Sequence, residues 1–201
     1  MKKCTIIGKT NVGKTLFFIN FAEYLGLKYL DIEFHEKKEV TKGRLSMKGA
    51  LTQLVNSQPH KTQCFQCLIV DIPIGKGKKK IQMIDTTGLI DGIHSDAAIR
   101  KAISQTLAVI RDSDIILHII DASAVDKDDL PSAMGPVDYE IAQFGQLKRG
   151  YAILANKMDI PGSEQGLKKI REEFCGNLII PISALKKTGF KEVKTFVAHN
   201  I

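Results

Sequence analysis

A glycine-containing loop near the start of the chain restricts the fold more than any other part of the sequence. The loop reads Gly8-Lys9-Thr10-Asn11-Val12-Gly13-Lys14-Thr15, which matches the pattern G-x-x-x-x-G-K-[ST]. A chance match in an ordinary turn is the alternative interpretation. An apolar strand pattern over residues 3–7 precedes the loop and a helix pattern over residues 14–25 follows it, so the context favours a phosphate-binding loop.

The residue types of this loop suit phosphate chemistry. Glycine lets successive backbone N–H groups turn toward a phosphate, and the helix that follows adds the positive end of its dipole. Lys14 would neutralise the β and γ phosphates and act in catalysis, and the hydroxyl of Thr15 would bind Mg²⁺. We therefore predict that all eight residues of the loop contact phosphate groups.

Short apolar segments alternate with longer amphipathic segments along the whole chain, which is typical of an α/β fold with a mostly parallel sheet. Six strands are predicted, over residues 3–7, 64–72, 80–85, 114–120, 151–155 and 178–182. Helices are predicted over residues 14–25, 96–111, 137–146, 164–174 and 190–199. A glycine-containing turn at residues 75–78 predicts one antiparallel strand. Residues 29–63 have the weakest pattern, and we expect them to form a long, partly mobile surface segment.

Length and composition indicate one soluble domain. The chain has 201 residues, of which 44% are hydrophobic and 25% charged, and its net charge of +7 favours an anionic partner. The sequence contains no apolar stretch of about 20 residues, so we expect a cytoplasmic protein without a membrane partner. Cys64 and Cys67 have the C-x-x-C spacing, but no second pair completes a zinc site, and small buried hydrophobes are the simpler interpretation.

A second motif follows the strand predicted at residues 80–85. Asp85 ends this strand and is followed by Thr86-Thr87-Gly88. An acidic residue at this position can hold the Mg²⁺ shell, and Gly88, which has no Cβ, would bring a backbone N–H close to the γ-phosphate. Alone, Asp-x-x-Gly usually marks a turn, but its place after a phosphate loop favours a catalytic role.

Two further motifs predict selection of guanine. Asn156-Lys157-Met158-Asp159 follows a buried strand pattern, at the sheet edge where open α/β folds bind ligands. The carboxylate of Asp159 can accept hydrogen bonds from N1–H and the amino group of guanine, which adenine does not offer as a pair. Asn156 and Lys157 would brace the loop and cover the base, and Ser183-Ala184-Leu185 would supply a backbone N–H to the guanine oxygen.

These four motifs, in this order, resemble the P-loop GTPases of the translation-factor class. The string Asp85-Thr86-Thr87-Gly88-Leu89-Ile90-Asp91-Gly92-Ile93-His94 and the segment from Gly135 to Pro161 are similar to the Obg family. Pro59-His60-Lys61-Thr62 resembles the switch I motif of Obg and Era GTPases. The resemblance implies a Ras-like G domain over residues 1–201, helices on both faces of its sheet, residues 29–63 as a long switch I segment, and Thr62 as a catalytic residue and second Mg²⁺ ligand.

The resemblance also implies a reaction. We expect a GTP and GDP switch that hydrolyses GTP slowly, because Leu89 stands where many GTPases have a water-orienting Gln. Asn11 matches the K⁺ ligand of potassium-dependent Era-like and MnmE-like GTPases; a hydrogen bond within the loop is the alternative. A role in ribosome assembly and a nucleotide-dependent dimer are further expectations of this class.

Other function classes remain open from the residues alone. A scaffold that binds GTP with little hydrolysis fits Leu89 equally well, and a small-molecule kinase fits the phosphate loop but leaves Asn156 to Asp159 unexplained. Lys76, Lys78, Lys79 and Lys80 lie at the predicted hairpin and could contact RNA, although charged turns are usually solvated surface.

Overall fold

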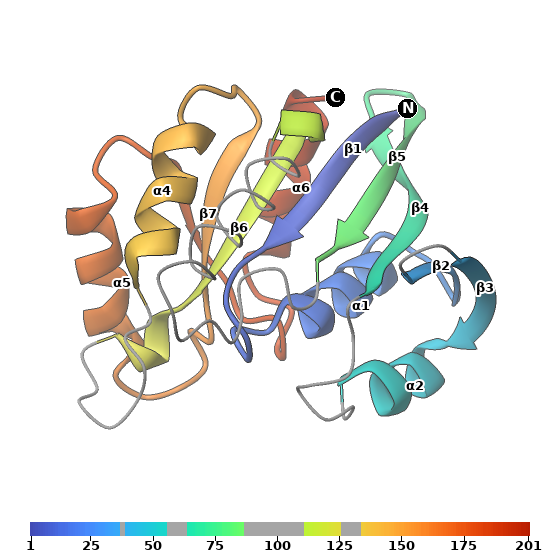
Figure 1. Ribbon diagram of the computed structural model, residues 1–201, viewed down its shortest axis with the longest axis horizontal. Coiled ribbons are helices and arrows are strands. Elements are labelled where there is room, and N and C mark those ends of the chain that lie inside the picture. Colours follow the sequence, from blue (N-terminus) through green and yellow to red (C-terminus); the bar gives the residue numbers. More distant parts are fainter. Residues whose placement is uncertain (37–38, 56–63, 87–110, 126–133) are drawn as a thin grey trace.

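The computed structural model describes residues 1–36, 39–55, 64–86, 111–125 and 134–201 (Figure 1). Within them, one eight-stranded sheet has the order β3-β2-β4-β5-β1-β6-β7-β8. The strands are β1 (Lys2–Ile7), β2 (Tyr29–Glu36), β3 (Glu39–Ser46), β4 (Cys64–Ile74), β5 (Gly77–Asp85), β6 (Ile115–Asp121), β7 (Tyr151–Asn156) and β8 (Ile179–Pro181). The α-helices are α1 (Lys14–Tyr24), α2 (Met47–Ala50), α4 (Pro136–Gly145), α5 (Ser163–Glu173) and α6 (Phe190–His199). A π-helical segment (Leu51–Val55) follows α2, and a 3-10 turn (Ala122–Ala124) follows β6.

Five neighbouring strands, β5, β1, β6, β7 and β8, are parallel, as the alternation of strand and helix patterns predicts. The helices lie on both faces of this sheet (Figure 1). On one face, Phe17 and Phe21 of α1 pack edge-on against Phe190 of α6, with ring centroids 5.3 and 5.5 Å apart. On the other face, Ile141 of α4 and Ile170 of α5 belong to a second apolar cluster. The α/β fold with two helical layers is therefore confirmed.

The expected number of strands, six with one antiparallel, is wrong for the described residues. Residues 29–36 and 39–46, expected to belong to a partly mobile surface segment, form β2 and β3, which pair antiparallel. β2 also pairs antiparallel with β4, which pairs antiparallel with β5. Residues 47–55 are helical. The remainder of the segment, residues 56–63, lies outside the described residues, as does most of the helix predicted over 96–111.

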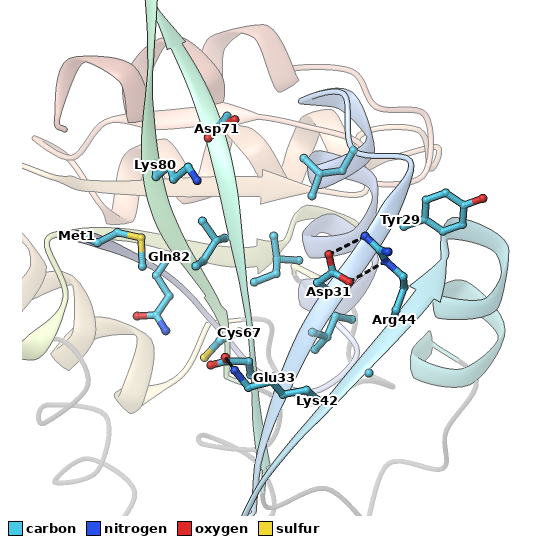
Figure 2. Close-up of a pocket in the computed structure, with 15 residues that line it drawn as sticks. Met1, Tyr29, Asp31, Glu33, Lys42, Arg44, Cys67, Asp71, Lys80 and Gln82 are labelled. Carbon is cyan, nitrogen blue, oxygen red and sulfur yellow. Dashed lines mark hydrogen bonds and ion pairs between the residues drawn. The ribbon is translucent and has the colours of Figure 1, made fainter.

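The alternation of apolar and charged residues along β2 explains why this segment forms a hairpin. Leu30 and Ile32 are fully buried on the α1 side, while Asp31 and Glu33 point to the other side. Asp31 pairs with Arg44 at 2.9 Å and Glu33 with Lys42 at 2.7 Å, each across the β2–β3 ladder (Figure 2). These pairs, with residues of β4 and β5, line a groove of about 830 Å³, and no residue of the phosphate loop or of the guanine motifs lines it. Opposite charges on facing positions favour this pairing register.

The remaining sequence expectations concern cysteine and membrane segments. Among the cysteines whose side chains the structure describes, Cys4 and Cys67 are buried free thiols and Cys175 is an exposed one. Burial raises the pKa of Cys67 to about 11, which disfavours the reactive thiolate. In the part of the chain that the structure describes, no helix combines the length and apolarity needed to cross a bilayer.

Candidate nucleotide-binding site

The loop between β1 and α1 lies at the carboxyl edge of the parallel strands (Figure 1), and its two glycines adopt backbone conformations that other residues rarely adopt. Gly8 has a φ of +144°, and a Cβ there would stand 2.3 Å from the carbonyl oxygen of Ile119. Gly13 has a φ of +99°, and its Cβ would stand 2.4 Å from Nδ2 of Asn156. Glycine is therefore required at both positions, by backbone conformation and by close neighbours.

The ammonium of Lys14 is folded into this loop. Its Nζ donates hydrogen bonds to the carbonyl oxygen of Gly8 at 2.7 Å and to that of Lys9. The residue is only 6% exposed. A cation held this close to the loop backbone adds its charge to the positive end of α1, which together make an anion-binding environment.

Thr15 and Asp85 meet where the phosphate loop approaches the end of β5. The Thr15 hydroxyl donates to Oδ2 of Asp85 at 2.8 Å. Asp85 is fully buried, and its other oxygen, Oδ1, has no hydrogen-bond partner among the described residues. Burial raises the pKa of Asp85 to about 6, although the Thr15 hydrogen bond and the charge of Lys14 act in the opposite direction.

This pair suits a hard divalent cation. A buried carboxylate oxygen that lacks a partner, beside a hydroxyl, offers the oxygen ligands that Mg²⁺ prefers. No group of three or more His, Cys, Asp or Glu side chains within the described ranges could hold a metal. A Mg²⁺ at Thr15 and Asp85 would thus complete its coordination with water and phosphate oxygens, as is usual for this ion in nucleotide sites.

Asn156 joins three of the predicted motifs. Its Nδ2 donates to the carbonyl oxygen of Val12 at 2.7 Å, and its Oδ1 accepts from the backbone N–H of Ala184 at 2.9 Å. The side chain is 2% exposed. Asn20 of α1 adds a second link, because its Nδ2 donates to the carbonyl oxygen of Ala184 at 2.8 Å. The phosphate loop and the loop after β8 are thereby held in one unit.

The remaining members of the two guanine motifs lie at the rim of this unit. The Ser183 hydroxyl donates to Oδ1 of Asp159 at 2.5 Å and accepts from the backbone N–H of Lys186 at 3.0 Å. Lys157 has a φ of +67°, and its Nζ lies 2.5 Å from Oδ2 of Asp121. Leu185 is 59% exposed. The carboxylate of Asp159 is thus oriented by a neighbouring hydroxyl while the residue stays accessible to a ligand.

A family model described as "50S ribosome-binding GTPase" matches residues 3–157, which is more than half of the chain. The chain belongs to this GTPase family. The match covers the phosphate loop, Asp85 and the first two residues of the Asn156–Asp159 motif.

Individual relatives agree with this membership. GTPase Obg of Ruminiclostridium cellulolyticum is 29% identical over 161 residues, covering 78% of this chain and 36% of the relative. GTPase Obg of Shouchella clausii is 30% identical over 122 residues, covering 59% of this chain and 28% of the relative. The GTPase described here thus matches only about a third of the length of these relatives.

Solved structures show the same fold. Era of Aquifex aeolicus bound to GDP·AlF4⁻ is similar with a TM-score of 0.59 and 21% identity, covering 100% of this chain and 57% of that one. Era in complex with MgGDPNP and nucleotides of 16S ribosomal RNA has a TM-score of 0.57 and 22% identity, covering 99% and 56%. The G domain of the FeoB iron transporter of T. maritima has a TM-score of 0.55 and 16% identity, covering 100% and 98%.

The structure does not test every predicted site residue of this GTPase. Thr62, Gly88 and Leu89 lie outside the described residues. Asn11 has a φ of +61° and an exposed side chain, which leaves both its interpretations open. The other predicted phosphate, metal and guanine residues all lie at the carboxyl edge of the central strands.

The sequence motifs missed a buried polar network beside the GTPase phosphate loop. Oδ1 of Asp138 on α4 lies 3.1 Å from Nε2 of His118, whose Nδ1 lies 2.9 Å from the hydroxyl of Tyr151. Lys9, predicted only as a phosphate contact, reaches Oδ2 of Asp138. A polar residue inside the apolar pattern of residues 115–120 was the one available signal, because a buried His needs partners.

Proposed function

We propose that this GTPase binds GTP with Mg²⁺, hydrolyses it slowly to GDP and phosphate, and acts as a molecular switch. The observation that carries the proposal is the double hydrogen bond of Asn156, to Val12 in the phosphate loop and to Ala184 beside the base motif. The Asn156 side chain thereby holds the phosphate loop and the base-binding loop next to each other. A single G domain over residues 1–201 is part of the proposal.

Each phosphate contact has a role in this proposal. The loop backbone from Gly8 to Gly13 binds the β-phosphate, and Lys14 exchanges its carbonyl contacts for the β and γ phosphate oxygens. Thr15 and Asp85 would hold Mg²⁺, and the ion would supply positive charge that neutralises the phosphate oxygens. Asp85 binds the cation as a carboxylate, so its raised pKa makes metal binding stronger as pH rises through about 6.

Guanine selection rests on Asp159. Its carboxylate accepts from N1–H and the amino group of the base, while the Ser183 hydroxyl holds one oxygen in place. The stem of Lys157 covers the base, with its ammonium fixed by Asp121. Adenine would leave an anionic acceptor without donors, at a cost of about 1–3 kcal/mol or more.

Hydrolysis in this proposal is slow and depends on an additional group. Leu89 offers no hydrogen bond to the attacking water, so Thr62 and the backbone of Gly88 contribute to the site without a water-orienting Gln. A K⁺ bound by Asn11 would supply the missing positive charge. Hydrolysis rates in KCl and NaCl test this step, and equal rates would remove K⁺ from the mechanism.

The switch needs a partner, and we propose RNA of the ribosome. The family model names ribosome binding, and one Era structure with the same fold contains 16S ribosomal RNA. The cytoplasm is the proposed location, because the described cysteines are free thiols and disulfide bonds are rare there. A nucleotide-dependent dimer is the alternative arrangement for activation, and light scattering of the GTP-loaded chain detects it.

A fluorescent GDP analogue tests the proposed function directly. We expect GTP and GDP to displace the analogue and ATP to leave it bound, and we expect measurable GTP cleavage in a single turnover. Displacement by ATP and GTP at equal concentrations contradicts the base assignment. Tight GTP binding with no cleavage in a single turnover, with or without cell extract, supports the scaffold in place of the GTPase.

A further inference from the structure

Most of the net positive charge of the chain lies at the edge of the sheet opposite the nucleotide site. β5, β1, β6 and β7 are parallel, so their first residues meet at one edge of the sheet, and the nucleotide motifs follow their last residues (Figure 1). We define this amino edge as residues 1–3, 71–80, 111–114 and 148–150. It includes the tight turn between β4 and β5, in which Gly75 has a φ of +55°.

The amino edge is strongly cationic. Its nine cations are Lys2, Lys3, Lys76, Lys78, Lys79, Lys80, Arg111, Lys148 and Arg149. Its three carboxylates are Asp71, Asp112 and Asp114. The difference is six positive charges, against +7 for the whole chain. The net charge that composition alone could not place is therefore located almost entirely at this edge.

Few of these cations are neutralised. Lys2 pairs with Asp114 at 2.9 Å and Arg111 with Asp112 at 3.2 Å. Lys148 donates to the carbonyl oxygens of Arg111 and Ser113, at 2.7 and 2.6 Å, which makes it part of the fold. Within the described part of the chain, the lysines at positions 3, 76, 78 and 80 and Arg149 form no ion pair with an Asp or Glu side chain.

The β4–β5 hairpin projects the densest group of charges. Lys78, Lys79 and Lys80 are consecutive in β5, so their side chains alternate between the two faces of the strand, and Lys76 lies in the turn itself. All four residues are exposed. Cations on both faces of the hairpin can contact phosphates on two sides.

We propose that the amino edge, with the β4–β5 hairpin at its centre, binds the phosphate backbone of RNA. The inference rests on the proposed RNA partner and adds where this partner binds. A polyanion gains affinity from each neutralised phosphate. The densest group of charges is carried by the β4–β5 hairpin, whereas binding to a membrane surface usually uses an amphipathic helix with a basic face, so RNA fits this edge better than a bilayer.

The geometry separates the RNA surface from the nucleotide surface. The phosphate loop, Asp85 and Asn156 all lie at the opposite ends of the same strands, so RNA at the amino edge leaves the nucleotide accessible. GTP and RNA can therefore bind at the same time. This arrangement allows RNA affinity to be changed by substitution without touching any nucleotide contact.

The test replaces the four hairpin lysines by glutamine, which keeps a polar side chain and removes the charge. The probe is a labelled single-stranded RNA of mixed sequence, titrated at salt concentrations from about 50 to about 200 mM. We expect the quadruple variant, K76Q/K78Q/K79Q/K80Q, to lose at least tenfold in RNA affinity at the lowest salt. The slope of log K against log salt should fall by up to about 3, since each contacted phosphate contributes about 0.7.

Matched variants separate location from total charge. K28Q/K168Q/K191Q/K194Q removes the same number of charges from exposed or half-exposed positions that belong neither to the amino edge nor to the nucleotide motifs, and we expect it to bind RNA within twofold of the natural chain. The hairpin variant with arginine at all four positions should also retain binding. Equal losses in the glutamine hairpin variant and the control variant would overturn the proposal, as would unchanged affinity in the hairpin variant.

Two further measurements keep this proposal distinct from the proposed function. Affinity for the fluorescent GDP analogue should be unchanged in every variant, because none of these residues contacts the nucleotide site. If the natural chain binds RNA but the hairpin variant does so equally well, the location is wrong and the RNA partner stands. Binding to vesicles with anionic lipids, with no binding to RNA, contradicts both the proposed location and the proposed RNA partner.

Discussion

The ammonium of Lys9 in the phosphate loop lies 3.1 Å from Oδ2 of Asp138 on α4. Asp138 is 1% exposed, and its Oδ2 also accepts the backbone N–H of Gly135 at 2.8 Å, which caps the start of the helix. Its other oxygen meets His118 of β6. One buried carboxylate therefore holds the phosphate loop, the start of α4 and a central strand together.

Replacing Asp138 by Asn should destabilise the protein by about 3 kcal/mol, because removing the charge from a buried pair leaves its partners poorly compensated. Lys9→Met should cost about 1 kcal/mol or less, since the Lys9 side chain is 26% exposed and water can replace its contact. Urea unfolding at pH 7 measures both. Equal costs for the two variants would show that Asp138 acts only through Lys9.

The same carboxylate predicts a pH effect. Burial alone would raise the pKa of Asp138, but its interactions with His118, Lys9 and the backbone N–H of Gly135 outweigh burial and hold the pKa below the ordinary value of 3.8. A lowered pKa stabilises the folded chain above the unfolded-state pKa, and this contribution is lost as pH falls through the folded-state value. The deficit of Asp138→Asn should thus be full near pH 7 and shrink below about pH 4, and a constant deficit across this range contradicts it.

Asn156→Ala should lower the affinity for GDP by roughly 10–100-fold. The substitution removes the hydrogen bonds to Val12 and Ala184 and leaves a buried carbonyl and a buried N–H unpaired, at about 1–3 kcal/mol each. Titration with the fluorescent GDP analogue measures the loss. Asn20→Ala is the matched comparison, because it removes only the bond to the Ala184 carbonyl, and we expect a smaller effect.

Asp159→Asn should reduce the preference for GTP over ATP by at least tenfold, because the neutral amide cannot accept both donors of guanine. Ser183→Ala should retain guanine preference with weaker binding, since it removes only the hydroxyl that orients the carboxylate. Competition of GTP and ATP against the fluorescent analogue measures both variants. Full guanine preference in the Asp159 variant would show that another group reads the base.

Gly8→Ala should abolish nucleotide binding and destabilise the fold. Its Cβ would stand 2.3 Å from the backbone oxygen of Ile119, so part of β6 or the phosphate loop must move. Gly26→Ala is the control, because Gly26 also has a positive φ, +99°, but nothing lies within 4 Å of its Cβ position. The control should cost about 1–2 kcal/mol in strain alone and leave nucleotide binding intact. Thermal unfolding and the GDP titration separate the two effects.

The sequence by itself determined the parallel core of the fold and the positions of the nucleotide motifs. Gly8 and Gly13 could be predicted because a loop around phosphate needs backbone conformations that glycine supplies locally. Asp85 and Asn156 could be predicted because each ends an apolar strand pattern, and parallel strands end at one edge. These inferences need only a few consecutive residues.

The tertiary structure alone decided the hairpin of β2 and β3 and the partners of Asp138. Charged residues make up much of residues 29–46, and Asp31 and Glu33 find Arg44 and Lys42 across the ladder, so the pattern of one strand does not reveal its partner. His118 and Asp138 are 20 residues apart and meet because β6 and α4 pack together. The grouping of cations at the amino edge has the same origin, because strand order decides which segments become neighbours. Local conformation is encoded in short stretches of sequence, whereas these contacts form only when distant segments pack into one sheet and its helical layers.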